Sequence, residues 1–126
     1  MRRLLSGFVS LFGIVCCLIA FTHICFGPSS IPGSVPVNAT MDSEDRFYAT
    51  IFLGFGVAII WCARDIVQRQ RTFQFLLVIF FLGGIARIVS AIAVGWPNAL
   101  FQFLGAIELV LPVLLYACLR SLNRRV

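Results

Sequence analysis

Two charged residues, Arg87 and Glu108, lie inside apolar stretches of a length that spans a membrane. On insertion scales, a charged side chain at the centre of a bilayer costs roughly 2.5–3.5 kcal/mol, so it needs a partner, water or a function. A guanidinium and a carboxylate can bind each other, bind a polar ligand or exchange a proton. These two residues are therefore the first candidates for chemistry.

The spacing of the two charges predicts that they meet. Arg87 precedes Trp96 by nine residues, and Glu108 follows Ala99 by nine. At 1.5 Å per helical residue, both lie about 13–14 Å from the turn at Pro97 that separates their helices. A short turn makes two helices antiparallel neighbours, so the side chains face each other at one depth. We expect an ion pair.

The pair has two interpretations. It can be structural, fixing the register of two helices, because removing one partner of a buried pair costs roughly 3–5 kcal/mol. It can also be the floor of an outward-facing polar pocket that binds a small amphipathic ligand. In that case Arg87 would hold an anionic or carbonyl group and Glu108 would orient the arginine. The candidate wall residues are the polar side chains in the outer half of the helices: Ser90, Gln102, Tyr48 and His23.

The interpretations of the ion pair lead to several alternative functions. We predict a non-enzymatic membrane protein that binds a small amphipathic ligand or lipid, or that is an accessory subunit of a membrane complex, with homo-oligomers also open. The alternative is a membrane enzyme or proton-coupled transporter that uses Glu108 as its titrating group. A neighbouring arginine keeps a carboxylate ionised and therefore argues against titration. A purely structural role, with lipid-facing aromatic residues as a docking surface, is a third interpretation.

Composition and hydropathy indicate the elements that must position these residues. The chain has 126 residues, of which 60% are hydrophobic and 12% charged, whereas soluble domains carry roughly 25% charged residues. Apolar runs near the length of a bilayer predict an all-α, four-helix transmembrane bundle in a single domain. The helices are expected at about 4–26, 47–67, 72–96 and 99–119, with a proline-containing outer loop at 27–46.

The distribution of basic residues predicts the topology. Ten arginines and no lysine give a net charge of +5. Eight of them gather at the chain ends and at the turn between the second and third helices, on one side of a four-helix path, while Arg46 lies on the other side. The positive-inside rule therefore predicts both termini in the cytoplasm. The arginines are scattered and no basic patch interleaved with aromatics is visible, so nucleic-acid binding is not expected.

The acidic cluster of Asp42, Glu44 and Asp45 in the outer loop is the other group of ionisable residues. Carboxylate-only metal binding by these side chains is conceivable. The plainer interpretation is a solvated loop that begins the second helix, where acids favour the helix dipole. His23 is the one histidine, which excludes a bis-histidine haem, and the five cysteines show no metal-ligand or disulfide spacing. We therefore predict no metal and no cofactor.

Three segments resemble those of a known family. They are Met41-Asp42-Ser43-Glu44 continuing through Arg46-Phe47-Tyr48, Phe81-Leu82-Gly83-Gly84-Ile85-Ala86-Arg87, and Ile107-Glu108-Leu109. Together they are similar to a family of small bacterial membrane proteins that is classed only as a domain of unknown function. The resemblance implies a four-helix integral membrane protein and no particular activity. The general layout also resembles the small four-helix DoxX-like proteins.

Overall fold

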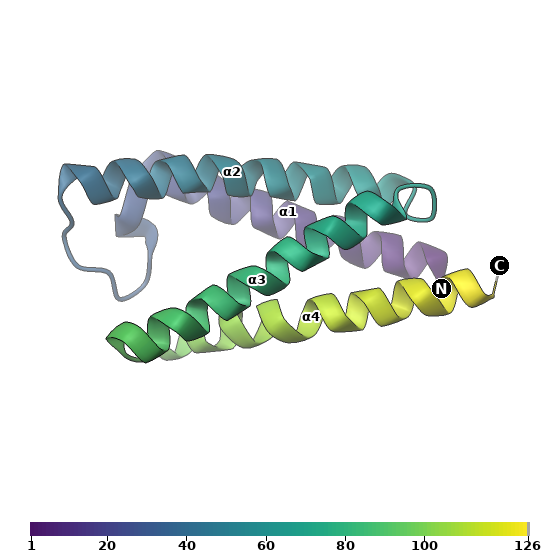
Figure 1. Ribbon diagram of the computed structural model, residues 1–126. Coiled ribbons are helices and arrows are strands. Elements are labelled where there is room, and N and C mark those ends of the chain that lie inside the picture. The colour runs from purple at the N-terminus through teal and green to yellow at the C-terminus, as the bar shows by residue number, and fades with distance from the viewer. Residues whose placement is uncertain (126) are drawn as a thin grey trace. The chain divides into compact units, whose positions relative to one another are not determined.

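A computed structural model describes residues 1–125, and its regular structure is entirely helical. Four long helices, α1 (Arg2–Phe26), α2 (Ala39–Arg64), α3 (Gln70–Val94) and α4 (Ala99–Arg124), are joined by a short 3-10 helix, η1 (Gly27–Ser30), and by turns (Figure 1). All four are long and apolar enough to cross a membrane. The predicted all-α class with four membrane-length helices is confirmed. The chain forms two compact units, Ser6–Asp65 and, separately, Met1–Leu5 with the chain from Ile66 onward.

Helix α2 begins earlier than the sequence analysis predicted. It starts at Ala39 rather than near residue 47, so the second half of the predicted loop is helical. The side chain of Asn38 caps the helix by accepting a hydrogen bond of 2.9 Å from the backbone N–H of Met41. A polar first turn carrying such a cap is stable in water, and hydropathy does not register it. The helix also ends at Arg64, short of the predicted 67.

The turn between α3 and α4 lies between a glycine that ends α3 and an asparagine that caps the start of α4. Gly95 has a φ of +111°, which a residue with a side chain rarely adopts, so α3 ends at Val94 rather than at Trp96. The side chain of Asn98 then accepts a hydrogen bond of 3.1 Å from the backbone N–H of Leu100 and caps α4. Helices α3 and α4 differ from prediction at their far ends too, beginning at 70 and continuing to 124.

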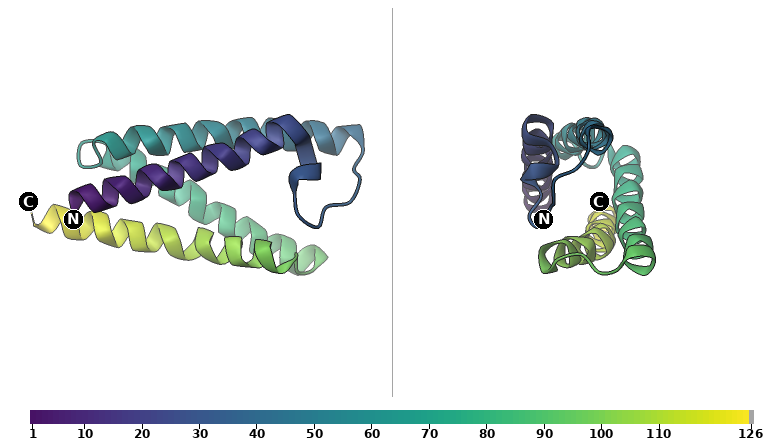
Figure 2. Two further views of the ribbon diagram at one scale, coloured as in Figure 1. Left: turned by 180° about the vertical axis from the view of Figure 1, so that it is seen from behind. Right: turned by 90° about the vertical axis from the view of Figure 1, so that its left-hand side faces the viewer.

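In the unit Ser6–Asp65, α1 and α2 run side by side (Figure 2). Their backbones approach closely at two glycines. A Cβ atom added to Gly13 would lie 2.9 Å from the backbone oxygen of Gly56, and one added to Gly56 would lie 3.0 Å from the oxygen of Gly13. Beside this close approach, the rings of Phe12 and Phe55 meet edge to face at 6.3 Å. Small residues at helix crossings let backbones pack tightly, which is the main source of attraction between helices in lipid.

In the other unit, α3 and α4 form an antiparallel hairpin. Gly84 of α3 is buried, and a Cβ atom added to it would lie 2.9 Å from the side chain of Leu109 and 3.2 Å from Cβ of Glu108. Near the far end of the hairpin, Asn123 donates a hydrogen bond of 2.6 Å to the side-chain oxygen of Gln70. The close approach at Gly84 brings α4 against α3 at the level of Glu108.

Candidate functional site

Arg87 of α3 and Glu108 of α4 form an ion pair. The Nε atom of Arg87 donates a hydrogen bond of 2.7 Å to Oε2 of Glu108. Because α3 ends at Val94, Arg87 is seven residues from its helix end, about 10–11 Å, while Glu108 is about 13–14 Å from the start of α4. The side chains reach each other across this offset, so the pairing expected from the spacing is present. Their exposures differ, at 42% for Arg87 and 15% for Glu108.

One stripe of α4 shapes the environment of Arg87. Phe101, Gly105, Glu108 and Pro112 follow one another at helical spacings of four, three and four residues. A Cβ atom at Gly105 would lie 3.4 Å from Cδ of Arg87, so the glycine leaves room for the arginine stem. Cζ of Arg87 lies 5.7 Å from the centroid of the Phe101 ring, within the range of a cation–π contact. The stripe thus holds the guanidinium beside Glu108.

The ion pair uses a small part of the hydrogen-bonding capacity of Arg87. A guanidinium carries five N–H donors, and arginine commonly binds a carboxylate through two parallel hydrogen bonds. Within residues 1–125, the hydrogen bonding of this guanidinium involves Nε alone. Its Nη donors therefore remain available to a hydrogen-bond acceptor supplied from elsewhere.

Pro112 interrupts the backbone hydrogen bonding of α4 one turn beyond Glu108. It lies inside α4 and is buried. Proline has no backbone N–H, so it cannot donate the helical hydrogen bond to the carbonyl four residues earlier, which is that of Glu108. In lipid, such a carbonyl is satisfied by a local adjustment of the helix, a neighbouring side chain or water. The site therefore combines free donors on α3 with a missing backbone donor on α4.

The other predicted wall residues of α3 and α4 are placed differently. Ser90 lies three residues after Arg87 on α3 and is exposed. Gln102 donates a hydrogen bond of 2.9 Å to the backbone oxygen of Pro97, so its amide nitrogen contributes to the turn before α4. Tyr48, in the unit Ser6–Asp65, is exposed and stands edge to face with Phe47 at a centroid distance of 5.6 Å.

His23 and two residues of the acidic cluster form side-chain hydrogen bonds inside the unit Ser6–Asp65. The Nδ1 atom of His23 lies 3.0 Å from Oδ2 of Asp45, a hydrogen bond whose proton position depends on the tautomer. Asp42 accepts hydrogen bonds of 2.8 Å and 3.3 Å from Arg46, while Glu44 is exposed. Two of the three acids are thus paired with α1 or α2 side chains. Among residues 1–125, no three histidine, cysteine or acidic side chains are grouped as a metal site requires.

Arg46 is a residue whose role the sequence analysis missed. Its Nη1 atom donates hydrogen bonds of 2.8 Å and 3.2 Å to the backbone oxygens of Ile24 and Cys25, in the last turn of α1. Terminal carbonyls of a helix lack intrahelical donors and are stabilised by a cation. Gly27, with a φ of +66°, ends α1 at this point. The one available signal was the spacing of four residues between Asp42 and Arg46, typical of a helical ion pair.

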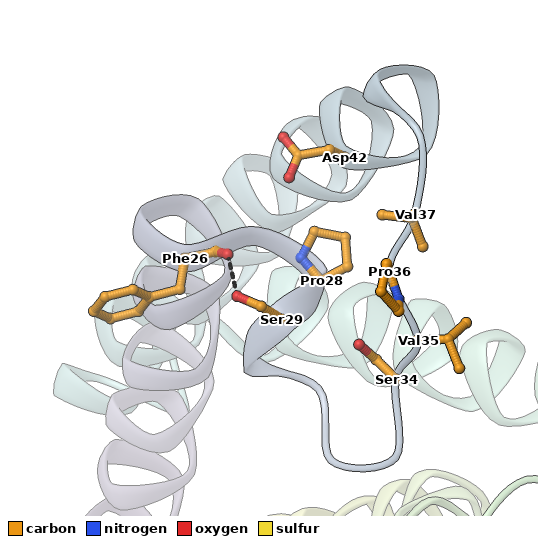
Figure 3. Close-up of a pocket in the computed structure, with 8 residues that line it drawn as sticks. All are labelled: Phe26, Pro28, Ser29, Ser34, Val35, Pro36, Val37 and Asp42. Atoms are coloured by element: carbon orange, nitrogen blue, oxygen red, sulfur yellow. Dashed lines mark hydrogen bonds between the residues drawn. The ribbon is translucent and has the colours of Figure 1, made fainter.

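The segment between α1 and α2 encloses a hollow of about 470 Å³ (Figure 3). Within it, the hydroxyl of Ser29 donates a hydrogen bond of 2.7 Å to the backbone oxygen of Phe26. Of the residues predicted to form a site, the hollow includes Asp42 alone, and its lining consists of Phe26, Pro28, Ser29, Ser34, Val35, Pro36, Val37 and Asp42. It depends on the path of the chain after η1, which no sequence pattern specifies.

Four membrane-length helices with one ion pair in their apolar stretches define the class as a multi-pass membrane protein. The chain belongs to the family described as Domain of unknown function (DUF4345), which it matches over residues 4–119. The membership in a family of unknown function that the sequence motifs indicated is thus confirmed. No curated protein and no solved structure matches the chain.

Proposed function

We propose that this membrane protein binds a small amphipathic ligand at Arg87 and Glu108, without catalysis. In this proposal, the Nη donors of Arg87 hold an oxygen of the ligand, and Glu108 fixes the orientation of the guanidinium. Ser90, three residues along the same helix, is available as a further polar contact. Gln102, in the first turn of α4, remains a candidate for the wall of an outward-facing pocket.

The observation that supports this proposal is that Arg87 forms a hydrogen bond through Nε and none through its Nη atoms within residues 1–125. Its Nε is bonded to Glu108, its Nη donors have no hydrogen bond within residues 1–125, and its side chain is 42% exposed. An unsatisfied donor in hydrocarbon costs several kcal/mol. An arginine held in this state by Glu108, Gly105 and Phe101 favours an occupant that supplies an acceptor.

The location of the protein is part of the proposal. The distribution of arginines supports an orientation with both termini in the cytoplasm, and the resemblance to small bacterial membrane proteins supports a bacterial inner membrane. This orientation places the turn between α3 and α4 on the outer side, so that the ligand approaches Arg87 from the outer leaflet.

An accessory subunit of a membrane complex is the second candidate, because an acceptor from a partner chain would satisfy Arg87 equally well. A proton-coupled role for Glu108 receives less support. The carboxylate of Glu108 is already engaged in a 2.7 Å ion pair with Arg87.

Native mass spectrometry of the protein, extracted gently from its own membrane, tests the proposal. The wild type is compared with Arg87→Ala, with the double variant Arg87→Ala/Glu108→Ala, and with Arg120→Ala, a matched control at an exposed position of α4. We expect a bound small molecule in the wild type and in the control and none in the other two. Stoichiometric partner chains with no small molecule would replace ligand binding by the accessory role.

A further inference from the structure

We infer that the site at Arg87 selects a neutral hydrogen-bond acceptor, a carbonyl oxygen on an apolar molecule, over an anion. The inference rests on the proposed function and deepens it by naming the ligand class. It depends on the charge balance of the site, the geometry of its donors and its depth along the helices.

The charge balance comes first. The guanidinium of Arg87 is already neutralised by Glu108, whose Oε2 lies 2.7 Å from Nε. Between residues 72 and 119, which cover the apolar parts of α3 and α4, these are the only two charged residues. A bound anion would leave the site with a net negative charge at a depth where no other cation of these helices can compensate it. A neutral carbonyl leaves the charge balance unchanged. A bound anion adds an uncompensated charge, which hydrocarbon strongly disfavours.

The donors of Arg87 also match a carbonyl. A carbonyl oxygen has two lone pairs and accepts two hydrogen bonds, and the guanidinium presents four N–H groups on its two Nη atoms. The edge that carries Nε is occupied by Glu108, and the Phe101 ring lies 5.7 Å from Cζ. What remains open is the edge formed by the Nη atoms, which donates hydrogen bonds in one plane.

The depth of the site favours an apolar body on the ligand. Arg87 is seven residues from the end of α3, or about 10–11 Å along the helix axis. On the same face of α3, two turns further along, lies the aliphatic side chain of Val94, which is 87% exposed. A molecule that reaches Arg87 from the bilayer must therefore pass and contact apolar surface. A chain or ring system bearing a carbonyl meets both requirements.

Two sources can supply this chemistry, namely the ester carbonyl of a membrane lipid and a free amphipathic ketone or quinone. Reconstitution of the full chain into nanodiscs of diester or dialkyl-ether phospholipid separates them, since the ether lipid lacks the carbonyl. Lipid retained through gentle extraction from diester but not from ether nanodiscs identifies the bilayer as the source. Equal lipid retention from both nanodiscs, together with saturable binding of an added ketone, identifies a free molecule.

The selectivity test uses three probes of similar chain length in ether-lipid nanodiscs, with binding read by native mass spectrometry. They are 2-undecanone, the decanesulfonate anion, which stays ionised at every working pH, and undecane, which has no acceptor. For the wild type, we expect 2-undecanone to bind at least about tenfold more tightly than either of the others, a ratio that corresponds to about 1.4 kcal/mol.

Glu108→Gln provides the sharper measurement, because it removes the negative charge and retains the side-chain volume. Arg87 is then an uncompensated cation, and the preference should invert toward decanesulfonate by at least about tenfold. Arg87→Gln should bind none of the three probes selectively. Gly83→Ala serves as the control on the same helix, because its new Cβ atom would lie 3.9 Å from Oε2 of Glu108, an ordinary van der Waals distance that displaces neither side chain of the pair.

The outcomes separate the inference from the proposed function. Tighter binding of decanesulfonate to the wild type would overturn the choice of a neutral ligand while leaving a binding site at Arg87. Failure of all three probes, in wild type and Glu108→Gln alike, would overturn the binding function itself. Selective ketone binding that survives Arg87→Gln would show that the ligand sits elsewhere, and would contradict both.

Discussion

Removing the two charges of the pair singly and together should give a strong positive coupling in stability. The three variants are Arg87→Ala, Glu108→Ala and the double variant. Each single change leaves one ionisable group without its partner, whereas the double change removes both charges. We therefore expect the double variant to be closer to the wild type than the sum of the single losses.

The magnitude follows from the position of each group. An unpaired arginine at the centre of a spanning helix costs roughly 2.5–3.5 kcal/mol. Arg87 is 42% exposed and seven residues from the end of α3, so its long side chain can turn toward the interface, which lowers the cost to about 2 kcal/mol. Glu108 without Arg87 is an unsatisfied polar group, which costs roughly 1–3 kcal/mol. The single losses then sum to about 3–5 kcal/mol, and the double variant, which leaves neither group unpaired, should lose little of this, so the expected coupling energy is about 3 kcal/mol or more.

Reversible unfolding in mixed micelles, followed by circular dichroism, measures the four free energies that a double-mutant cycle requires. The matched background variant is Ser90→Ala, which removes a polar side chain from α3 without removing a charge, and it should couple weakly to Glu108→Ala. A coupling energy between Arg87 and Glu108 below about 0.5 kcal/mol, the scatter expected of independent sites, would refute the reasoning.

Three further predictions concern helix packing and the end of α1. Gly84→Val should lower the free energy of unfolding by about 1–3 kcal/mol, because its Cβ atom would lie 2.9 Å from a side chain of α4. Gly83→Ala, whose Cβ atom meets nothing closer than 3.9 Å, is the control. An equal loss of stability in both variants would contradict the packing argument. Gly56→Ala should be destabilising by about the same amount, because its Cβ atom would approach α1 within 3.0 Å, whereas Gly54→Ala meets nothing within 4 Å and should gain up to about 1 kcal/mol from helix propensity. Arg46→Gln should accelerate backbone hydrogen exchange in the last turn of α1 and in η1, because two terminal carbonyls lose their donor; unchanged exchange there, with the rest of the chain as internal reference, would exclude a capping role.

The sequence predicted the elements of the site better than its surroundings. The pairing of Arg87 with Glu108 was predictable because it depends on two helical spacings and one short turn, which hydropathy and Pro97 mark clearly. The start of α2 was not predictable, because its first eight residues include Asp42 and Glu44. A hydropathy profile excludes these residues from an apolar helix. Their helical state depends on the Asn38 cap, which satisfies backbone donors without adding apolar residues.

Contacts between distant residues were the least predictable. Arg46 binds backbone oxygens that precede it by 22 and 21 residues, and nothing in its immediate sequence indicates such partners. The pairing of His23 with Asp45 likewise depends on the way α1 and α2 lie alongside each other. The sequence analysis assigned His23 to a pocket on polarity alone, and its partner came from the register between the two helices.

The composition of the Arg87 site is hard to explain as structural reinforcement alone. A pair selected to hold two helices together would gain most from two parallel hydrogen bonds between buried side chains. Here the arginine uses Nε alone and is 42% exposed, while the carboxylate is 15% exposed. Pro112, one turn beyond Glu108, also withholds a backbone donor where satisfied backbone groups matter most. The unused Nη donors of Arg87 leave hydrogen-bonding capacity within the span, which a bound polar group can satisfy and a purely structural ion pair does not need.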